Sequence, residues 1–176
     1  METQLGMALD TFRLDIGRYP AGVDATAEAV SAAFAGATFD SVARPDVMRW
    51  KYRKLEVNLG NAADAVAGAT ARSSPVVDRA VAAAAAVFDA AGIDRASEEE
   101  DMARRGDLLR MHAIDGDRWQ GGSSWQSLAR GAGSIETDYL NGEIVLLGRL
   151  HGVPTPVNEV LQRVAREAAA AGRPPG

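Results

Sequence analysis

The chain has 176 residues, 47% of them hydrophobic, which suffices for one domain with its own core, or for one domain and part of another. Its formal net charge of −5 argues against a general binder of nucleic acid or of anionic membranes, because both require a basic protein surface. It has no cysteine, which excludes disulfides, thiolate nucleophiles and cysteine zinc sites.

The N-terminal residues METQLGMALD lack the charged and apolar regions of a signal peptide. The longest apolar run, residues 80–88, is too short and too rich in alanine to span a bilayer. We therefore expect a cytoplasmic, soluble protein without membrane or nucleic-acid partners.

The first 43 residues combine strand and helix signals. Residues 12–16 alternate apolar and polar side chains before the turn GRYPAG, which predicts a short strand. A helix capped by Asp24 or Thr26 is expected to end near Gly36, and residues 38–43 (TFDSVA) are expected to form a second strand. Together these elements make one βαβ-like unit, which is too small to stand as an independent sheet.

From Pro45 onward the pattern predicts helices. The expected helices cover residues 45–68, 73–92, 97–109, 123–131, 134–152 and 154–172, with a Gly- and Asp-rich loop over 115–123. Ser97 and Glu100 have the spacing of a capping box. We expect residues 1–43 and 44–176 to be separate regions, the second mostly α.

Lys54, Asn58 and Asn61 are spaced at i, i+4 and i+7, which would place all three on one face of a continuous helix. One interpretation is an ordinary solvated face. The other is a binding wall, because an ammonium beside two amides suits a small oxyanion or hydroxy acid. Asparagine is a poor helix former, so two of them on the lysine's own face favour the second interpretation.

A second polar stretch covers residues 123–142. Glu136 is expected in the first turn of a helix capped by Ser134, where the helix dipole favours a carboxylate whatever its function. Asp138 and Asn141 are interpreted as an ordinary polar pair. Gly142 and Gly148 are helix-interior glycines, which indicate close approach of another helix or of a ligand.

Other polar features predict no site. His112 and His151 lie in no metal-ligand pattern, so we expect no metal. The acidic run 98–101 is interpreted as a helix N-terminus on the surface, and the basic residues within 49–53 as a solvated helix face with two packed aromatic rings. No GxGxxG, P-loop or GxSxG motif occurs.

Taken together, the two polar stretches resemble the C-terminal half of the ketopantoate reductase (2-dehydropantoate 2-reductase) family. The family's aromatic-x-Lys-Leu-x-x-Asn helix is matched by residues 52–58 (YRKLEVN). Its serine twelve residues before the glutamate of a T-E-I-D-x-x-N-G helix is matched by Ser124 and by IETDYLNGE. The ending HGVPTPVNEVLQ and the segment LDIGRYPAG are also similar to family segments.

The resemblance implies a fold and a set of roles. It implies a multi-helix domain like the C-terminal domain of 6-phosphogluconate dehydrogenase, preceded by part of a Rossmann domain in residues 1–43. Lys54 would be the general acid that protonates the substrate carbonyl while NADPH donates a hydride. Asn58, Asn61 and Ser124 would bind the substrate, and Glu136 would lie near the cofactor.

The chain also departs from the family pattern. The family's second asparagine falls eight residues after the lysine, where this chain has Ala62, so Asn61 is one residue early and turned by about 100°. Leu128 replaces a frequent aspartate, and Tyr52 a tryptophan. The Gly-rich motif that cradles a dinucleotide pyrophosphate has no counterpart, so NADP would require a Rossmann domain supplied elsewhere.

The sequence therefore predicts the substrate-binding and catalytic half of an NADP-dependent 2-keto-acid reductase of pantothenate biosynthesis, inactive by itself. Its expected partners are a small 2-keto acid and either further copies of itself or a separate cofactor-domain chain. The alternative is a non-catalytic binding or dimerisation module that has lost the cofactor domain.

Overall fold

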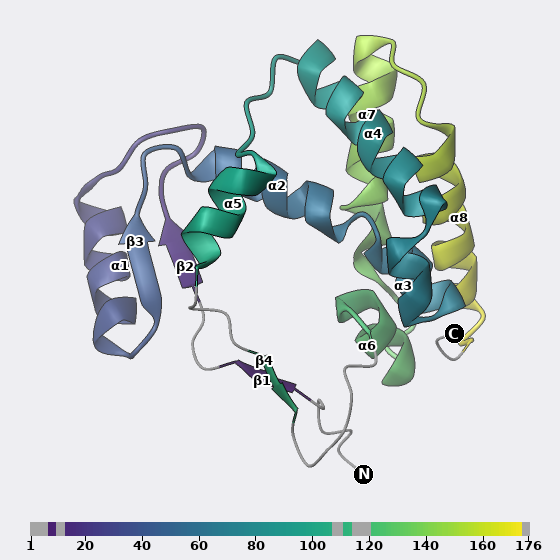
Figure 1. Ribbon diagram of the computed structural model, residues 1–176, viewed down its shortest axis with the longest axis horizontal. Coiled ribbons are helices and arrows are strands. Elements are labelled where there is room, and N and C mark those ends of the chain that lie inside the picture. The colour runs from purple at the N-terminus through teal and green to yellow at the C-terminus, as the bar shows by residue number, and fades with distance from the viewer. Residues whose placement is uncertain (1–6, 10–12, 107–110, 114–120, 174–176) are drawn as a thin grey trace. The chain divides into compact units, whose positions relative to one another are not determined.

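The computed structural model describes residues 7–9, 13–106, 111–113 and 121–173 (Figure 1). They form two compact units. The N-terminal unit contains the described residues within 4–54 and 95–119, and the helical unit those within 55–94 and 120–176. Helix α2 (Val47–Asn58) belongs to the first unit up to Lys54 and to the second from Leu55.

The N-terminal unit contains the predicted βαβ arrangement. Strands β2 (Arg13–Ile16) and β3 (Asp40–Ala43) are parallel, with Arg13 opposite Asp40, and α1 (Ala25–Gly36) connects them and packs beside them (Figure 1). The Asp24 side chain caps α1 by accepting a hydrogen bond from the Ala27 N–H at 2.8 Å. The strand, helix and cap predicted from local patterns are confirmed.

A second small sheet in this unit was not predicted. Strand β1 (Met7–Leu9) pairs antiparallel with β4 (Met111–Ala113), with Ala8 opposite His112. Three-residue strands from distant parts of the chain leave no periodic signal. Residues 115–120 of the predicted loop lie outside the described residues.

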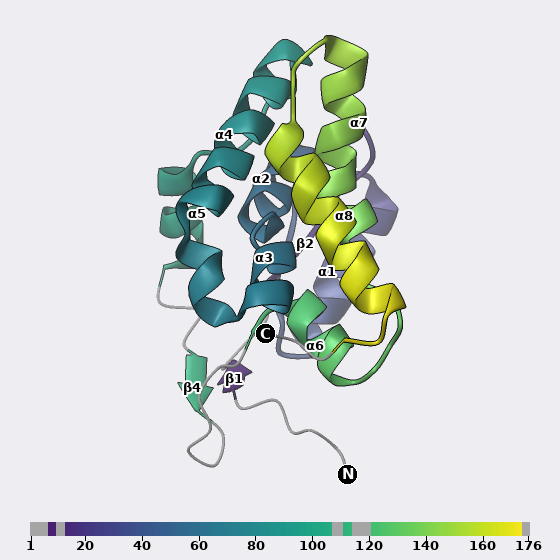
Figure 2. The same ribbon diagram turned by 90° about the vertical axis from the view of Figure 1, so that its right-hand side faces the viewer.

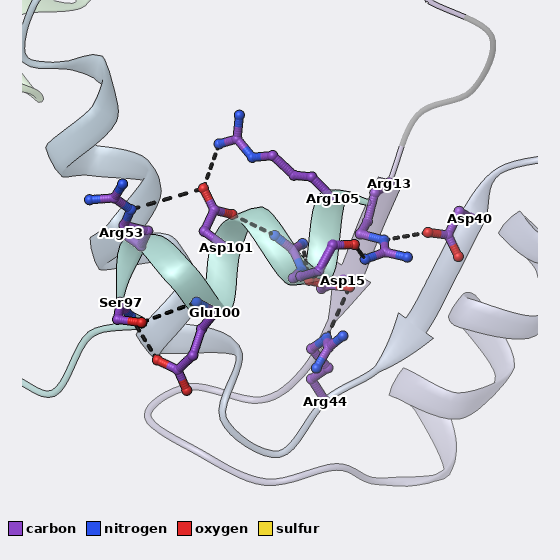
Figure 3. Close-up of polar contacts among 10 residues, drawn as sticks. Arg13, Asp15, Asp40, Arg44, Arg53, Ser97, Glu100, Asp101 and Arg105 are labelled. Carbon is purple, nitrogen blue, oxygen red and sulfur yellow. Dashed lines mark hydrogen bonds and ion pairs between the residues drawn. The ribbon is translucent and has the colours of Figure 1, made fainter. Parts of the chain in front are cut away.

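Helix α5 (Glu98–Arg105) is attached to α2 by ion pairs, and its predicted capping box is confirmed. Glu100 accepts hydrogen bonds from both terminal nitrogens of Arg49, at 3.1 and 3.0 Å. Asp101 is only 5% exposed and lies near Arg53 and Arg105 (Figure 3). The acidic run forms the first turn of α5 with residues 98–100 exposed, so its prediction as a surface helix N-terminus is confirmed. The basic residues are not a simple solvated face, because Arg49 and Arg53 pair with Glu100 and Asp101.

Charged groups from different elements also meet around β2. Asp15 contacts Arg44 at 3.2 Å and hydrogen-bonds Arg104 (Figure 3 shows Asp15 and Arg44). Both guanidinium groups lie over the Trp50 ring, with centroid distances of 5.0 and 4.6 Å. These pairs join β2, α2 and α5 within the N-terminal unit.

The helical unit packs several helices around a small apolar core. Its elements are α3 (Asn61–Ala67), η1 (Ala69–Ser73), α4 (Pro75–Ala90), α6 (Ser123–Ala129), η2 (Glu136–Asp138), α7 (Asn141–His151) and α8 (Pro156–Ala170). Helices α4, α7 and α8 lie side by side (Figures 1 and 2), and Phe88, Leu59, Ile144 and Val87 are fully buried.

Two long helices predicted in this region are interrupted. The helix expected over 45–68 begins at Val47 and breaks between Asn58 and Asn61. A Cβ at Gly60 would lie 3.2 Å from Arg72 Cγ and from Val77 Cγ1, so these two side chains pack closely against the backbone at the break. The helix expected over 134–152 begins only at Asn141, after the short η2 turn.

The two glycines of α7, Gly142 in its first turn and Gly148 in its interior, have the predicted use. An added Cβ at Gly142 would lie 2.6 Å from the Gln162 side chain on α8. At Gly148 it would lie 2.7 Å from both Thr155 Cγ2 and the Val153 carbonyl oxygen. Both glycines therefore allow α7 to approach α8 and the turn before it.

Within the described residues, none of the helices has the length and apolar character needed to cross a bilayer. The same residues contain no group of three or more His, Cys, Asp or Glu side chains suited to a metal ion.

Candidate functional site

Lys54 and Asn58 lie four residues apart on α2, on one helical face as expected. Lys54 is exposed, and Asn58, the last residue of the helix, is half-buried. Asn61 does not extend this face, because the break at Leu59 and Gly60 intervenes and Asn61 starts α3. The predicted i, i+4, i+7 stack is therefore wrong for Asn61.

Asn61 instead belongs to a buried polar cluster that we call the Arg72 cluster. It consists of Asn61, Asp64, Arg72, Gly122 and Ser123. Asn61, 3% exposed, accepts a hydrogen bond from Arg72 Nη1 at 2.5 Å and donates one from Nδ2 to Ser123 Oγ at 3.3 Å. Its amide thus joins α3 to η1 and to the start of α6.

Asp64 is the fully buried carboxylate of the Arg72 cluster. Its Oδ2 accepts a hydrogen bond from the backbone N–H of Gly122 at 2.6 Å and lies 3.7 Å from Arg72 Nη1. Arg72 also donates from Nη2 to the Val57 carbonyl at 3.2 Å. Sequence analysis missed Asp64 and Arg72, and the interior position of Asp64 in an alanine-rich helix was the only local signal for it.

Gly122 is pressed against these side chains. A Cβ there would lie 3.0 Å from Asn61 Oδ1 and 3.1 Å from both Arg72 Nη1 and Asp64 Oδ2. These positions leave little room for any other residue. The backbone before α6 is therefore held by direct contact with the cluster.

Ser124 follows this anchored segment and is 2% exposed. Its hydroxyl is buried, and no residue in the described part of the chain hydrogen-bonds it. A buried polar atom without a partner costs about 1–3 kcal/mol, so its retention calls for an explanation such as a ligand contact.

Glu136 is exposed at the start of η2, in the same unit as Ser124. The prediction that Ser134 caps a helix beginning here is wrong: Ile135 precedes the turn and its side chain makes no capping hydrogen bond. The turn is held by backbone bonds from Tyr139 and Leu140 to the Glu136 carbonyl, at 3.0 and 3.1 Å.

Two asparagines form a separate network in the core. Asn141 Nδ2 donates to Asn158 Oδ1 at 3.0 Å and to the Leu59 carbonyl at 3.3 Å. Asn158 Nδ2 donates to the Ala80 carbonyl at 3.0 Å. The expected pairing of Asn141 with Asp138 is replaced by these buried bonds, whereas Asp138 is exposed and accepts from Gln162 at 2.7 Å. This network joins α7, α8, α4 and the α2–α3 junction.

Comparisons with known proteins agree with this fold. A family model described as the ketopantoate reductase PanE/ApbA C terminal matches residues 46–169. A 2-dehydropantoate 2-reductase of Halobacterium salinarum is 31% identical over 161 residues, which are 87% of this chain and 50% of that protein.

Solved structures of this family are similar as well. A ketopantoate reductase of Ralstonia eutropha JMP134 superposes with a TM-score of 0.67 at 25% identity, covering 92% of this chain and 53% of that one. A dimeric ketopantoate reductase of Staphylococcus aureus superposes with a TM-score of 0.64 at 18% identity, covering 92% and 55%, and shows the fold alone.

The helices within residues 46–169 have the fold of the C-terminal domain of ketopantoate reductases. The chain belongs to the ketopantoate reductase family. It spans half the length of the Halobacterium relative.

The described residues do not fit a dinucleotide cofactor at the βα turn of the N-terminal unit. In a Rossmann turn the pyrophosphate is received at a helix N-terminus. Here the N-terminus of α1 is occupied by the Asp24 carboxylate, which also pairs with Arg18. These contacts lower the pKa of Asp24, the backbone N–H of Ala27 first and Arg18 second. A carboxylate that stays charged disfavours a phosphate at this place.

Proposed function

We propose that this chain is the substrate-binding and acid-catalytic half of an NADP-dependent 2-keto-acid reductase that converts 2-dehydropantoate or a related acid. Family membership supports the reaction class. The observation that carries the site is Ser124, whose buried hydroxyl lacks a partner among the described residues and adjoins a segment fixed by the Arg72 cluster.

In this proposal Lys54 is the general acid. A 2-keto acid becomes a 2-hydroxy acid when its carbonyl carbon gains a hydride and its oxygen gains a proton. The Lys54 ammonium holds that proton at Nζ and stabilises the negative charge that develops on the oxygen. The exposure of Lys54 on α2 leaves it reachable by a small molecule.

The amides and the hydroxyl orient the acid. Asn58, one helical turn from Lys54, would donate to the substrate's hydroxyl or carboxylate. Ser124 would supply its unpartnered hydroxyl. The side-chain carbonyl of Asn61 already accepts a hydrogen bond from Arg72, and one of its amide protons is donated to Ser123. We therefore propose that only its second amide proton is donated to the substrate.

The hydride donor, NADP in its reduced form, would be held by residues outside this sequence. Residues 1–43 are proposed to be part of that cofactor domain, and Glu136 to lie near the cofactor. The completing residues would come from a longer protein or from a separate chain. Because a family neighbour is dimeric, we also propose self-association of this chain, in the cytoplasm.

Two titrations of the purified chain test the proposal. Calorimetry with 2-dehydropantoate should show saturable binding that Asn58→Ala and Ser124→Ala each weaken about tenfold, as expected for one lost hydrogen bond. NADPH fluorescence should show no tight binding. Absence of 2-dehydropantoate binding would favour a non-catalytic module, and tight NADPH binding would contradict the assignment of the cofactor to other residues.

A further inference from the structure

We infer that Arg72 and Asp64 are positioning residues that set the spacing between Asn58 and Ser124. The inference rests on the proposed role of those two residues in substrate binding. All four residues belong to the helical unit.

Arg72 controls the Asn58 side of this arrangement. Its Nη2 donates at 3.2 Å to the carbonyl of Val57, the residue immediately before Asn58. That carbonyl lies in the last turn of α2, where no intrahelical N–H is left to satisfy it because the helix breaks at Leu59. Arg72 therefore acts as the cap that fixes the end of α2, and with it the backbone that carries Asn58.

Asp64 controls the Ser124 side. Its Oδ2 accepts from the N–H of Gly122, two residues before Ser124, at 2.6 Å. Asn61 adds a second attachment through Ser123 Oγ at 3.3 Å. Because a Cβ at Gly122 would lie within about 3 Å of three cluster atoms, the segment has little freedom to shift toward α3.

The guanidinium joins the two sides. One nitrogen, Nη1, donates to Asn61 and lies 3.7 Å from Asp64, while the other reaches Val57. The planar guanidinium of arginine can donate hydrogen bonds to several acceptors in different directions, whereas a lysine ammonium is a single point charge. Loss of Arg72 would release the Val57 carbonyl and leave the buried Asp64 carboxylate without its cation.

The test is a double-mutant cycle on the purified chain, read by calorimetry with 2-dehydropantoate. If Arg72 acts through the position of Asn58, Arg72→Met should weaken binding about tenfold in the wild-type background but less than twofold in the Asn58→Ala background. Arg72→Lys should recover part of the loss. Arg163→Met, which removes an exposed arginine of α8, is the matched control and should change binding less than twofold. Equal losses in both backgrounds would overturn the inference.

Amide hydrogen exchange separates this inference from the proposed function. Arg72→Met should speed exchange at the Gly122 N–H at least tenfold relative to Arg163→Met, while amides of α7 and α8 keep their rates. If the wild-type chain binds no 2-dehydropantoate, the proposed function fails. The exchange rate of the Gly122 N–H in Arg72→Met then tests by itself whether Arg72 positions this segment. Unchanged exchange at Gly122 would overturn that positioning role. If Arg72→Met does not fold, Arg72→Lys is judged by the same two readouts, with a smaller change in the same direction.

Discussion

Asn141 and Asn158 share a hydrogen bond of 3.0 Å at the centre of the helical unit, and neither side chain is exposed to solvent. Each side-chain amide also donates a hydrogen bond to a backbone carbonyl, Asn141 to that of Leu59 and Asn158 to that of Ala80. Leu59 lies at the break between α2 and α3, so this pair anchors the junction that separates Asn58 from Asn61.

Replacement of Asn158 by alanine should destabilise the helical unit. The change removes the bonds to Asn141 and Ala80 and leaves their polar atoms buried, which we expect to cost about 2–4 kcal/mol. Urea unfolding followed by circular dichroism measures this cost. Arg163→Ala, at an exposed position on the same helix, should change the free energy of unfolding by less than about 0.5 kcal/mol. A similar small effect for Asn158→Ala would contradict the network.

Gly148 and Gly142 form a matched pair on α7. Alanine is more favourable than glycine by about 1 kcal/mol in a helix interior, which is the position of Gly148, whereas Gly142 lies in the first turn of α7. At Gly148 the new Cβ would meet the Val153 carbonyl at 2.7 Å, and backbone cannot move aside easily, so Gly148→Ala should destabilise by about 1–3 kcal/mol. At Gly142 it would meet the flexible end of Gln162, so Gly142→Ala should be nearly neutral. Equal effects in thermal or urea unfolding would show that close approach does not explain both glycines.

The Arg49–Glu100 pair makes the N-terminal unit sensitive to acid. Hydrogen bonds from Arg49, and then from the Ser97 N–H, lower the pKa of Glu100 below its ordinary value of 4.5. A carboxylate whose folded pKa is lowered contributes stability above its unfolded pKa and loses it as the pH falls through the folded value.

Glu100→Gln should therefore destabilise the chain most at pH 6–7, and its difference from wild type should shrink as the pH falls below about 4.5. Urea unfolding midpoints at several pH values measure this difference. Glu99→Gln, on the same first turn of α5, is the control. A Glu100→Gln effect that stays constant from neutral to acid pH would contradict an ionised Glu100 as the cause.

Local interactions made part of this structure predictable. The capping box of Ser97 and Glu100 and the cap of α1 by Asp24 depend on residues within one helical turn, so their spacing suffices to predict them. The family motifs likewise located α2 and α6, which carry Lys54, Asn58 and Ser124.

Tertiary contacts made the rest unpredictable. The break after Asn58 lies where Arg72 and Val77 pack against Gly60, and neither is adjacent to it in sequence. Asp64 and Gly122 are far apart in the chain, and an aspartate in an alanine-rich helix gives no sign of a buried partner. The partners of the acidic run at 98–101 could not be predicted for the same reason, since Arg49 and Glu100 are 51 residues apart in sequence.

The central claim is that Lys54 supplies the proton in 2-keto-acid reduction, and turnover of a complemented enzyme tests it most directly. The chain would be joined to, or mixed with, the part of the Halobacterium relative that this chain does not match, and NADPH oxidation followed with 2-dehydropantoate. Lys54→Ala should lower kcat by about 10²–10⁴ with little change in KM, because the proton matters only as the alkoxide develops. Asn58→Ala should chiefly raise KM. Small and equal effects of the two substitutions, or no turnover in any complemented form, would contradict this claim.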